Sequence, residues 1–164
     1  LATPIQLAVM TASLANGGFI VQPRLMRATQ PAEPISIGLD PQDLARVNRA
    51  MYKVVNRPTG TAYDSSLLIN GNRMNGKTGT VQVRRISKDE RESGVISNKE
   101  LDWHLRDHSL FVGYAPHKNP RYAISIVIEH GGGGAYVAAP IARDIMVELL
   151  RSESLMRAKD EEVS

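Results

Sequence analysis

The spacing of apolar residues along the chain predicts three main helices. Each of the first two begins at a capping residue that is followed by a proline, at Thr3-Pro4 and at Asp40-Pro41. Turn-forming residues end these helices at 16–18 and at 56–60. The third helix is an apolar segment that runs from about Ala138 to Leu150.

Runs of β-branched and other apolar residues predict three strands late in the chain, at Met74–Val83, Ser109–Ala115 and Tyr122–Glu129. Residues 116–120 form a hairpin connection between the last two strands. Successive hairpin-like strands with helices before and after them predict an α+β fold, in which an antiparallel sheet is packed between helices. We also expect a short strand at 19–21, a short helix within 61–68 and a loop over residues 28–39.

Two segments lack a clear apolar pattern. Residues 84–107 contain six basic and six acidic residues, and the stretch is long for a connection without structure inside a compact domain. We expect a solvated insertion there, and a mobile lid beside a functional site is the alternative. Residues 151–164 are charged and are expected to form a frayed or disordered tail, which leaves residues 1–150 as the domain.

Composition narrows the possible functions only modestly. The chain of 164 residues is sufficient for one domain, and its net charge of +3 comes without a basic cluster or interleaved aromatic residues that would indicate a nucleic-acid partner. The absence of cysteine excludes disulfides and thiolate catalysis. No apolar run reaches the ~18–20 residues of a membrane span. Because the chain begins at Leu1 and within an element, we expect it to be a piece of a longer protein.

The stretch Gly76-Lys77-Thr78-Gly79-Thr80 carries the strongest chemical signal. Residues 71–78 match the G-x-x-x-x-G-K-[ST] pattern of P-loop nucleotide-binding proteins. That loop requires a helix to begin at the lysine, since the helix N-terminus supplies phosphate-binding donors. The residues after Thr78 instead predict a strand, which makes nucleotide binding the weaker alternative.

Two further patterns could mark functional sites. His130-Gly-Gly-Gly133 resembles the oxyanion-hole loop of lipases, but the chain has no G-x-S-x-G nucleophile elbow. We therefore interpret Gly131–Gly134 as a flexible exit from the last strand, where positive φ angles are needed. The four histidines show no metal-ligand spacing on a helix, so no metal site is predicted.

Lys-Thr-Gly on a strand is one of three signatures of penicillin-recognising acyl transferases. Other segments follow in the order and rough spacing of that family: Thr3–Ala8 with Asn16–Gly18, Gly60–Ala62, Lys77–Gln82, Phe111–Pro116, Pro120–Ala123 and Ala138–Arg143. The chain resembles the C-terminal part of the transpeptidase domain of a class B penicillin-binding protein, and it is most similar to elongation-type penicillin-binding protein 2. The resemblance extends from about Leu1 to Leu150 and implies the C-terminal portion of the β-lactamase/transpeptidase-like fold.

The resemblance also implies roles for the residues of the Lys-Thr-Gly strand. Lys77 would place positive charge near the nucleophile and the substrate carboxylate. The hydroxyls of Thr78 and Thr80 would bind the carboxylate of D-Ala-D-Ala or of a β-lactam, and Gly79 would leave room for the substrate backbone. The backbone N–H of Thr80 would be one of two oxyanion-hole donors. No cofactor or metal is implied.

The chain lacks the other signatures of this family. S-x-x-K, S-x-N and Y-x-N do not occur in it, so we expect the serine nucleophile and its base upstream of Leu1 and expect this chain alone to be inactive. The resemblance implies a peptidoglycan D,D-transpeptidase, with stem peptides, β-lactams, the upstream half of the domain and the cell-elongation machinery as partners. It also implies a location at the periplasmic face of the inner membrane, anchored through a segment absent from this chain. A non-catalytic penicillin-recognising module is a further alternative.

Overall fold

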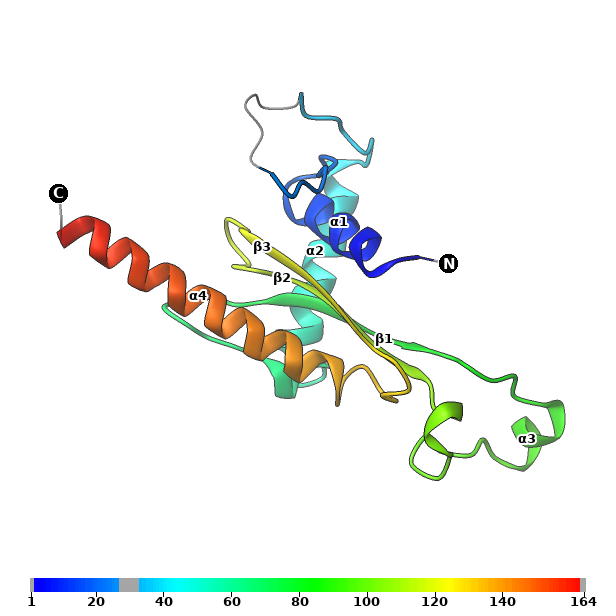
Figure 1. Ribbon diagram of the computed structural model, residues 1–164. Helices are drawn as coiled ribbons and strands as arrows, with labels where there is room; N and C mark the ends of the chain where they lie inside the picture. Colours follow the sequence, from blue (N-terminus) through cyan, green and yellow to red (C-terminus); the bar gives the residue numbers. More distant parts are fainter. Residues whose placement is uncertain (1, 27–32, 163–164) are drawn as a thin grey trace.

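The computed structural model describes residues 2–26 and 33–162, with side chains described up to residue 156. A three-stranded antiparallel sheet forms its centre (Figure 1). Helices α1 (Pro4–Ala15) and α2 (Pro41–Asn56) lie on one face of the sheet, and α4 (Ala138–Glu162) lies on the other. The short helix α3 (Lys88–Ser93) projects away from the sheet. The predicted α+β arrangement is therefore confirmed.

Both predicted helix caps are present. The Thr3 hydroxyl accepts a hydrogen bond from the N–H of Gln6, whose side chain accepts one from the N–H of Thr3 in return. The Asp40 side chain accepts from the N–H of Gln42. In each helix a proline occupies the first position, where its missing N–H costs no hydrogen bond.

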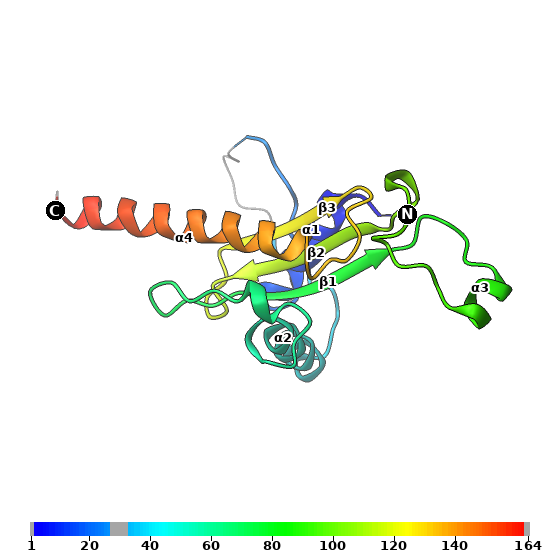
Figure 2. The same cartoon turned by 90° about the horizontal axis from the view of Figure 1, so that it is seen from below.

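The strands have the order β1-β2-β3, and each neighbouring pair is antiparallel. They are β1 (Asn75–Val81), β2 (His108–Ala115) and β3 (Tyr122–Ile128), close to the predicted bounds. The register places Thr78 opposite Phe111 and Thr80 opposite Ser109. Within the described part of the chain, β1 has a strand neighbour on one side only, so its other side is an open sheet edge, with α2 lying near the first part of it (Figure 2).

The hydrophobic core lies between the sheet and α4. The fully buried Phe111 points from β2 into this layer, where the buried face of α4 contributes small residues and two larger ones: Ala138, Ala139, Ala142, Met146 and Leu150. Burial of apolar surface stabilises a fold by about 25 cal/mol per Å², so this layer contributes substantially to stability. It fixes the position of β2 and, through β2, that of the edge strand β1.

On the other face, one asparagine joins three elements. Asn48 of α2 donates from its side-chain nitrogen to the carbonyl of Leu14 at the end of α1, at 3.0 Å. Its own carbonyl accepts from the side chain of Asn75 in β1, also at 3.0 Å. The two helices and the beginning of the edge strand are therefore held together by directional contacts.

Three smaller predictions had mixed outcomes. Phe19 makes a single bridge to Ser36, so no strand forms at 19–21. The short helix expected within 61–68 is only a 3-10 turn, Tyr63–Ser65. The predicted loop at 28–39 lies partly outside the described residues, and 33–39 contains no helix or strand.

The C-terminal segment also differs from the prediction. Helix α4 does not end at Leu150 but continues to Glu162. Glu153 pairs with Arg121 at 2.5 Å and accepts a hydrogen bond from the hydroxyl of Tyr122, while Ser154 accepts one from Asn70. These contacts with distant segments hold the helix beyond its apolar part.

Residues 84–107 contain more structure than expected, namely α3 and a 3-10 turn at Trp103–Leu105. Figures 1 and 2 show this connection reaching outward beyond the end of the sheet. Among the described residues, every helix is too short or too polar to cross a lipid bilayer.

Candidate active site

The Lys-Thr-Gly stretch lies on the open edge strand. Residues Lys77, Thr78, Gly79 and Thr80 all fall inside β1, so no helix begins at the lysine. The P-loop interpretation, which requires that helix, is therefore wrong. The Lys77 ammonium donates to the carbonyl of Thr78 at 2.7 Å.

The backbone of β1 alternates between its neighbour and the open side. A Cβ built on Gly134 would be 2.3 Å from the carbonyl of Leu110 and 2.9 Å from the nitrogen of Gly79, so these two groups meet on the inner side. The Thr78 carbonyl, which accepts a hydrogen bond from the Lys77 ammonium, belongs to the residue before Gly79. Since successive residues of a strand alternate in direction, the N–H and C=O groups of Thr78 and Thr80 point to the open side.

Side chains of β1 divide between the two faces of the sheet. Thr78 and Thr80 share a face with Phe111 and therefore lie on the side of α4. Lys77 shares the opposite face with Asn75, which bonds to Asn48 of α2. The predicted site thus presents two hydroxyls on one face and a cation on the other, with the open edge between them.

The Thr78 hydroxyl has a partner that sequence reasoning did not assign. Its oxygen lies 3.0 Å from the hydroxyl oxygen of Thr61, seventeen residues earlier. The turn that carries Thr61 is shaped by Gly60, where a Cβ would lie 2.2 Å from the carbonyl of Val54. Ala62 next to it is buried in the core. The only signal for Thr61 in the sequence was its place in the Gly60-Thr-Ala62 motif.

The four glycines after β3 pack against the site. A Cβ on Gly134 would lie 2.4 Å from the carbonyl oxygen of Gly79, and one on Gly131 would lie 3.0 Å from Ser109. Only Gly132 of the four has a positive φ, of 81°. The expected positive φ is therefore present at Gly132, whereas close approach to the sheet is the requirement at Gly131 and Gly134.

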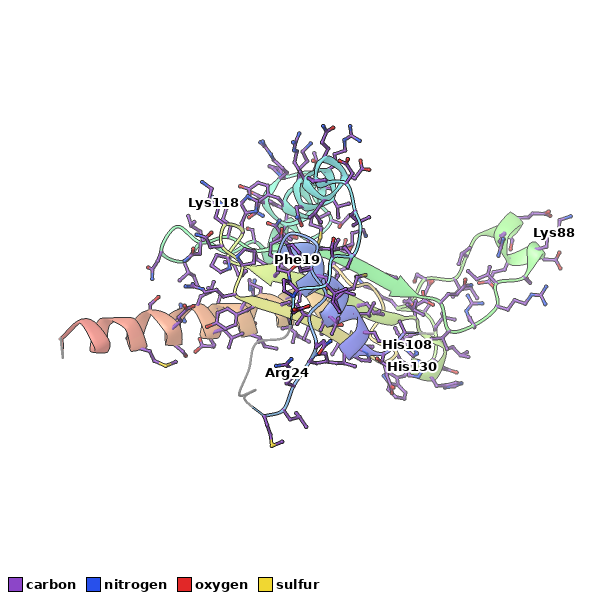
Figure 3. All side chains as sticks on the ribbon, turned by 90° about the horizontal axis from the view of Figure 1, so that it is seen from above. Phe19, Arg24, Lys88, His108, Lys118 and His130 are labelled. Carbon is purple, nitrogen blue, oxygen red and sulfur yellow. The ribbon has the colours of Figure 1, made fainter. Side chains whose placement is uncertain are left out.

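An aromatic cluster lies where β2 begins and β3 ends. Figure 3 shows His108 and His130 side by side, and their ring centroids are 4.8 Å apart. The ring of Trp103 contacts His130 at 4.7 Å. His108 Nδ1 accepts a hydrogen bond from the backbone N–H of His130. Within residues 2–26 and 33–162, no three acidic or histidine side chains form a metal-ligating group.

An ion pair orders the connection after β1. Arg84 and Glu90 form a two-pronged pair, and their side chains are only 19% and 15% exposed. The hydrogen bonds from the Arg84 guanidinium lower the pKa of Glu90 to about 2, and the N–H of Ile96 contributes to this shift. The connection therefore has its own fixed geometry at the end of the edge strand.

Comparison with known proteins identifies the family. The protein-family model described as "Penicillin binding protein transpeptidase domain" matches residues 1–147 of this chain. The peptidoglycan D,D-transpeptidase MrdA of Haemophilus influenzae is 36% identical over 155 residues, which cover 88% of this chain and 23% of that protein. MrdA of Escherichia coli K12 is 30% identical over 165 residues, covering 93% of this chain and 25% of that protein.

Solved structures agree with this assignment. PBP2 of Pseudomonas aeruginosa, in complex with WCK 5153, has a TM-score of 0.67 and 38% identity, over 88% of this chain and 29% of that one. PBP2 of Helicobacter pylori, in complex with MreC, has a TM-score of 0.71 and 27% identity, over 92% of this chain and 25% of that one. The chain spans about a quarter of the length of the curated relatives that it matches. The chain therefore belongs to the penicillin-binding protein transpeptidase family, with the PBP2-type proteins as its relatives.

Proposed function

We propose that this chain forms the Lys-Thr-Gly wall of the active site in a peptidoglycan D,D-transpeptidase. The observation that carries the proposal is the open edge of β1 with the motif at its centre. An unpaired strand edge is a template for an extended peptide, which would bind by main-chain hydrogen bonds. The substrate would be a stem peptide that ends in D-Ala-D-Ala, and β-lactams would compete with it.

The reaction is acyl transfer by a serine supplied from outside this chain. The serine oxygen attacks the carbonyl between the two D-Ala residues, the terminal D-Ala leaves with a proton on its nitrogen, and an acyl-enzyme remains. An amine of a neighbouring stem peptide then attacks the ester, which releases the serine and forms the cross-link. Each step passes through a tetrahedral oxyanion that needs fixed donors.

The residues of β1 would perform distinct tasks in these steps. The N–H of Thr80 points to the open side and would donate to the oxyanion, a contact worth about 2.7–4 kcal/mol in transition-state stabilisation. The hydroxyls of Thr78 and Thr80 lie on one face and would bind the substrate carboxylate. The Thr61 hydroxyl, 3.0 Å from that of Thr78, would orient it. Lys77 would move its ammonium from the Thr78 carbonyl toward the nucleophile or the carboxylate.

The relatives support a cellular setting for this activity. PBP2 of Helicobacter pylori was solved as a complex with MreC, and we propose that this chain likewise belongs to an elongation complex that maintains cell shape. Because cross-linking takes place outside the cytoplasmic membrane, we place the protein at the periplasmic face of the inner membrane.

The test is covalent labelling of the complete domain, extended upstream of Leu1, with benzylpenicillin. Intact mass should show a single adduct, and Thr78→Ala should slow its formation. Thr78→Ser keeps the hydroxyl and should retain more of the rate than the alanine variant. Thr59→Ala, at an exposed position outside the strand, should leave the rate unchanged.

Two results would overturn the proposal. A demonstrably folded domain that gains no adduct would not be a transpeptidase. Saturable but non-covalent β-lactam binding would then support the non-catalytic penicillin-recognising module. An adduct whose rate is unaffected by Thr78→Ala would remove the Lys-Thr-Gly strand from the mechanism.

A further inference from the structure

A cavity of about 450 Å³ lies between the connection 84–107 and the loop that follows β3. Its walls include Asn98, Lys99 and Arg106 from the connection, and Gly132 and Tyr136 from the loop. None of these residues belongs to the Lys-Thr-Gly motif or to the other segments that carry the family resemblance.

The cavity presents two cations without a carboxylate partner in the described part of the chain. Arg106 is positioned by a hydrogen bond from its Nε to the carbonyl of Leu101, at 2.9 Å, which leaves the two terminal nitrogens of its guanidinium without a partner there. Lys99 is exposed and makes no ion pair among these residues. A guanidinium fixed at Nε is well suited to receive a carboxylate.

Asp107, which follows Arg106 in the chain, is already engaged. Asp107 accepts hydrogen bonds from the side chain of Asn98, at 3.0 Å, and from the N–H of Val83, at 3.4 Å. Its backbone N–H donates to the Asn98 side-chain oxygen at 2.8 Å. The Asp107 carboxylate is thus held by neutral donors, and the positive charge in the cavity is left for a ligand.

The remaining wall offers an aromatic surface. Tyr136 is 83% exposed although its ring edge packs beside Gly133, where a Cβ would lie 3.2 Å from the ring. An exposed ring beside two cations and an amide fits a peptide that carries a carboxylate, because the ring covers apolar atoms while the cations bind the charge.

The loop that lines the cavity also packs on the edge strand. Gly134 packs on Gly79, and the carbonyl of Gly133 accepts a hydrogen bond from the Ser109 hydroxyl at 3.2 Å. Ser109 is the register partner of Thr80. The loop that carries Tyr136 therefore begins beside the face on which Thr78 and Thr80 present their hydroxyls. A peptide bound along β1 would reach the cavity after it passes Thr80.

From this arrangement we infer that the cavity is a subsite for a second carboxylate of the substrate, at a distance from the D-Ala-D-Ala terminus. The inference rests on the proposed function, since it takes the stem peptide as the ligand of β1. Arg106 forms the principal contact, Lys99 adds charge, and Tyr136 covers the adjoining part of the peptide.

Two synthetic pentapeptides ending in D-Ala-D-Ala test this subsite. One carries a free internal carboxylate, and the other has a carboxamide in its place. Calorimetric titration of the complete domain should show tighter binding of the carboxylate peptide. Arg106→Gln should lower the affinity for the carboxylate peptide by about tenfold or more, as expected for a lost hydrogen bond to a charged group. It should leave the affinity for the carboxamide peptide unchanged. Lys99→Gln should have a smaller effect in the same direction.

Lys118→Gln is the matched control, because it removes the same charge. Lys118 lies on the β2–β3 hairpin, at the opposite end of the sheet from His108 and His130 (Figure 3). The Lys118→Gln variant should bind both peptides with the affinity of the unmodified protein. Arg106→Lys keeps the charge without the planar fork and should fall between the unmodified protein and Arg106→Gln.

Equal affinity of the unmodified protein for both peptides would overturn the inference. An Arg106→Gln variant that loses the same affinity for both peptides would overturn it as well. Benzylpenicillin labelling of the same samples separates this result from the proposed function. Labelling without carboxylate discrimination removes the subsite and leaves the enzyme. Discrimination without labelling removes the enzyme and leaves a carboxylate-binding cavity.

Discussion

The side-chain nitrogen of Asn75 donates a hydrogen bond to the hydroxyl of Tyr114, at 2.6 Å, between register partners of β1 and β2. The same hydroxyl donates to the side-chain oxygen of Asn48 in α2, at 3.0 Å. Burial of Tyr114 raises the pKa of its hydroxyl to about 12, so it remains protonated and can act as this donor. The beginning of the Lys-Thr-Gly strand is therefore bound to a helix through a tyrosine.

Tyr114→Phe should lower the free energy of unfolding by about 1–3 kcal/mol, because it leaves the Asn48 side-chain oxygen without its donor. Chemical denaturation measures this loss. The ordinary pKa of 10 applies in the unfolded chain, so the contribution of Tyr114 is complete below pH 10 and declines between pH 10 and about 12. Tyr114→Phe should remove this decline.

The control for Tyr114 is Tyr63→Phe, since Tyr63 is 41% exposed and its hydroxyl has no partner among the described residues. It should change stability by less than about 0.5 kcal/mol. If both variants lose the same amount, the buried hydroxyl does not hold β1 to α2.

Gly134→Ala should displace the edge strand. The new methyl group would lie within 2.3–2.9 Å of backbone atoms of Leu110 and Gly79, which cannot move without breaking the β1–β2 ladder. Overpacking of this kind costs about 1–3 kcal/mol, and the melting temperature measures it. In the complete domain the variant should also slow benzylpenicillin labelling.

Gly133→Ala is the neighbouring control. Its methyl group would meet only the ring of the exposed Tyr136, which can turn away. A melting temperature that falls equally in both variants would show that the Gly134–Gly79 contact has no special importance.

The Arg84–Glu90 pair should make the connection after β1 sensitive to acid. The pKa of Glu90 is lowered from 4.5 to about 2 in the folded protein. The pair therefore stabilises the segment fully above pH 4.5 and loses its effect as the pH falls toward 2. Hydrogen exchange should show amides of residues 84–98 losing protection over this window, before the strands do.

Glu90→Gln should lower the exchange protection of the same amides at neutral pH and remove most of its dependence on acid. Glu92→Gln is the comparison, because Glu92 lies 3.9 Å from Lys88 and both side chains are largely exposed. Identical exchange in the two variants would contradict a role for the Arg84–Glu90 pair.

Glu153→Gln should loosen the end of α4. It removes the ion pair with Arg121 and weakens the bond to Tyr122. Amides at 151–156 should exchange about three- to tenfold faster, which corresponds to about 0.7–1.4 kcal/mol. Glu148→Gln removes only an exposed pair with Arg151 and should leave these rates unchanged.

The elements with local signals could be predicted from the sequence. Thr3 and Asp40 cap their helices because a side-chain oxygen needs only a backbone N–H two or three residues later. The three strands follow from apolar runs separated by turns. The β-branched residues after Thr78 then placed Lys77 and Thr78 on a strand and argued against a helix start.

The features that the sequence did not reveal depend on partners far along the chain. The extension of α4 rests on Arg121 and Asn70, and the partner of Thr78 is Thr61. Gly134 is explained by the space beside Gly79 and not by its own backbone angles. Such contacts leave no periodic pattern, so they become visible only once the chain is folded.

The outward-reaching connection between β1 and β2 has an evolutionary consequence. Among the described residues, the hydrogen bonds of residues 85–101 remain within the segment 84–107, and the β1–β2 register is set by the sheet. Since loop-closure entropy grows slowly with length, residues can be gained or lost around 91–95 at small cost, because the Arg84–Glu90 pair is then retained. Lineages can therefore diversify this stretch while the edge that carries the Lys-Thr-Gly motif keeps its geometry, and the stretch is a suitable place to insert a reporter.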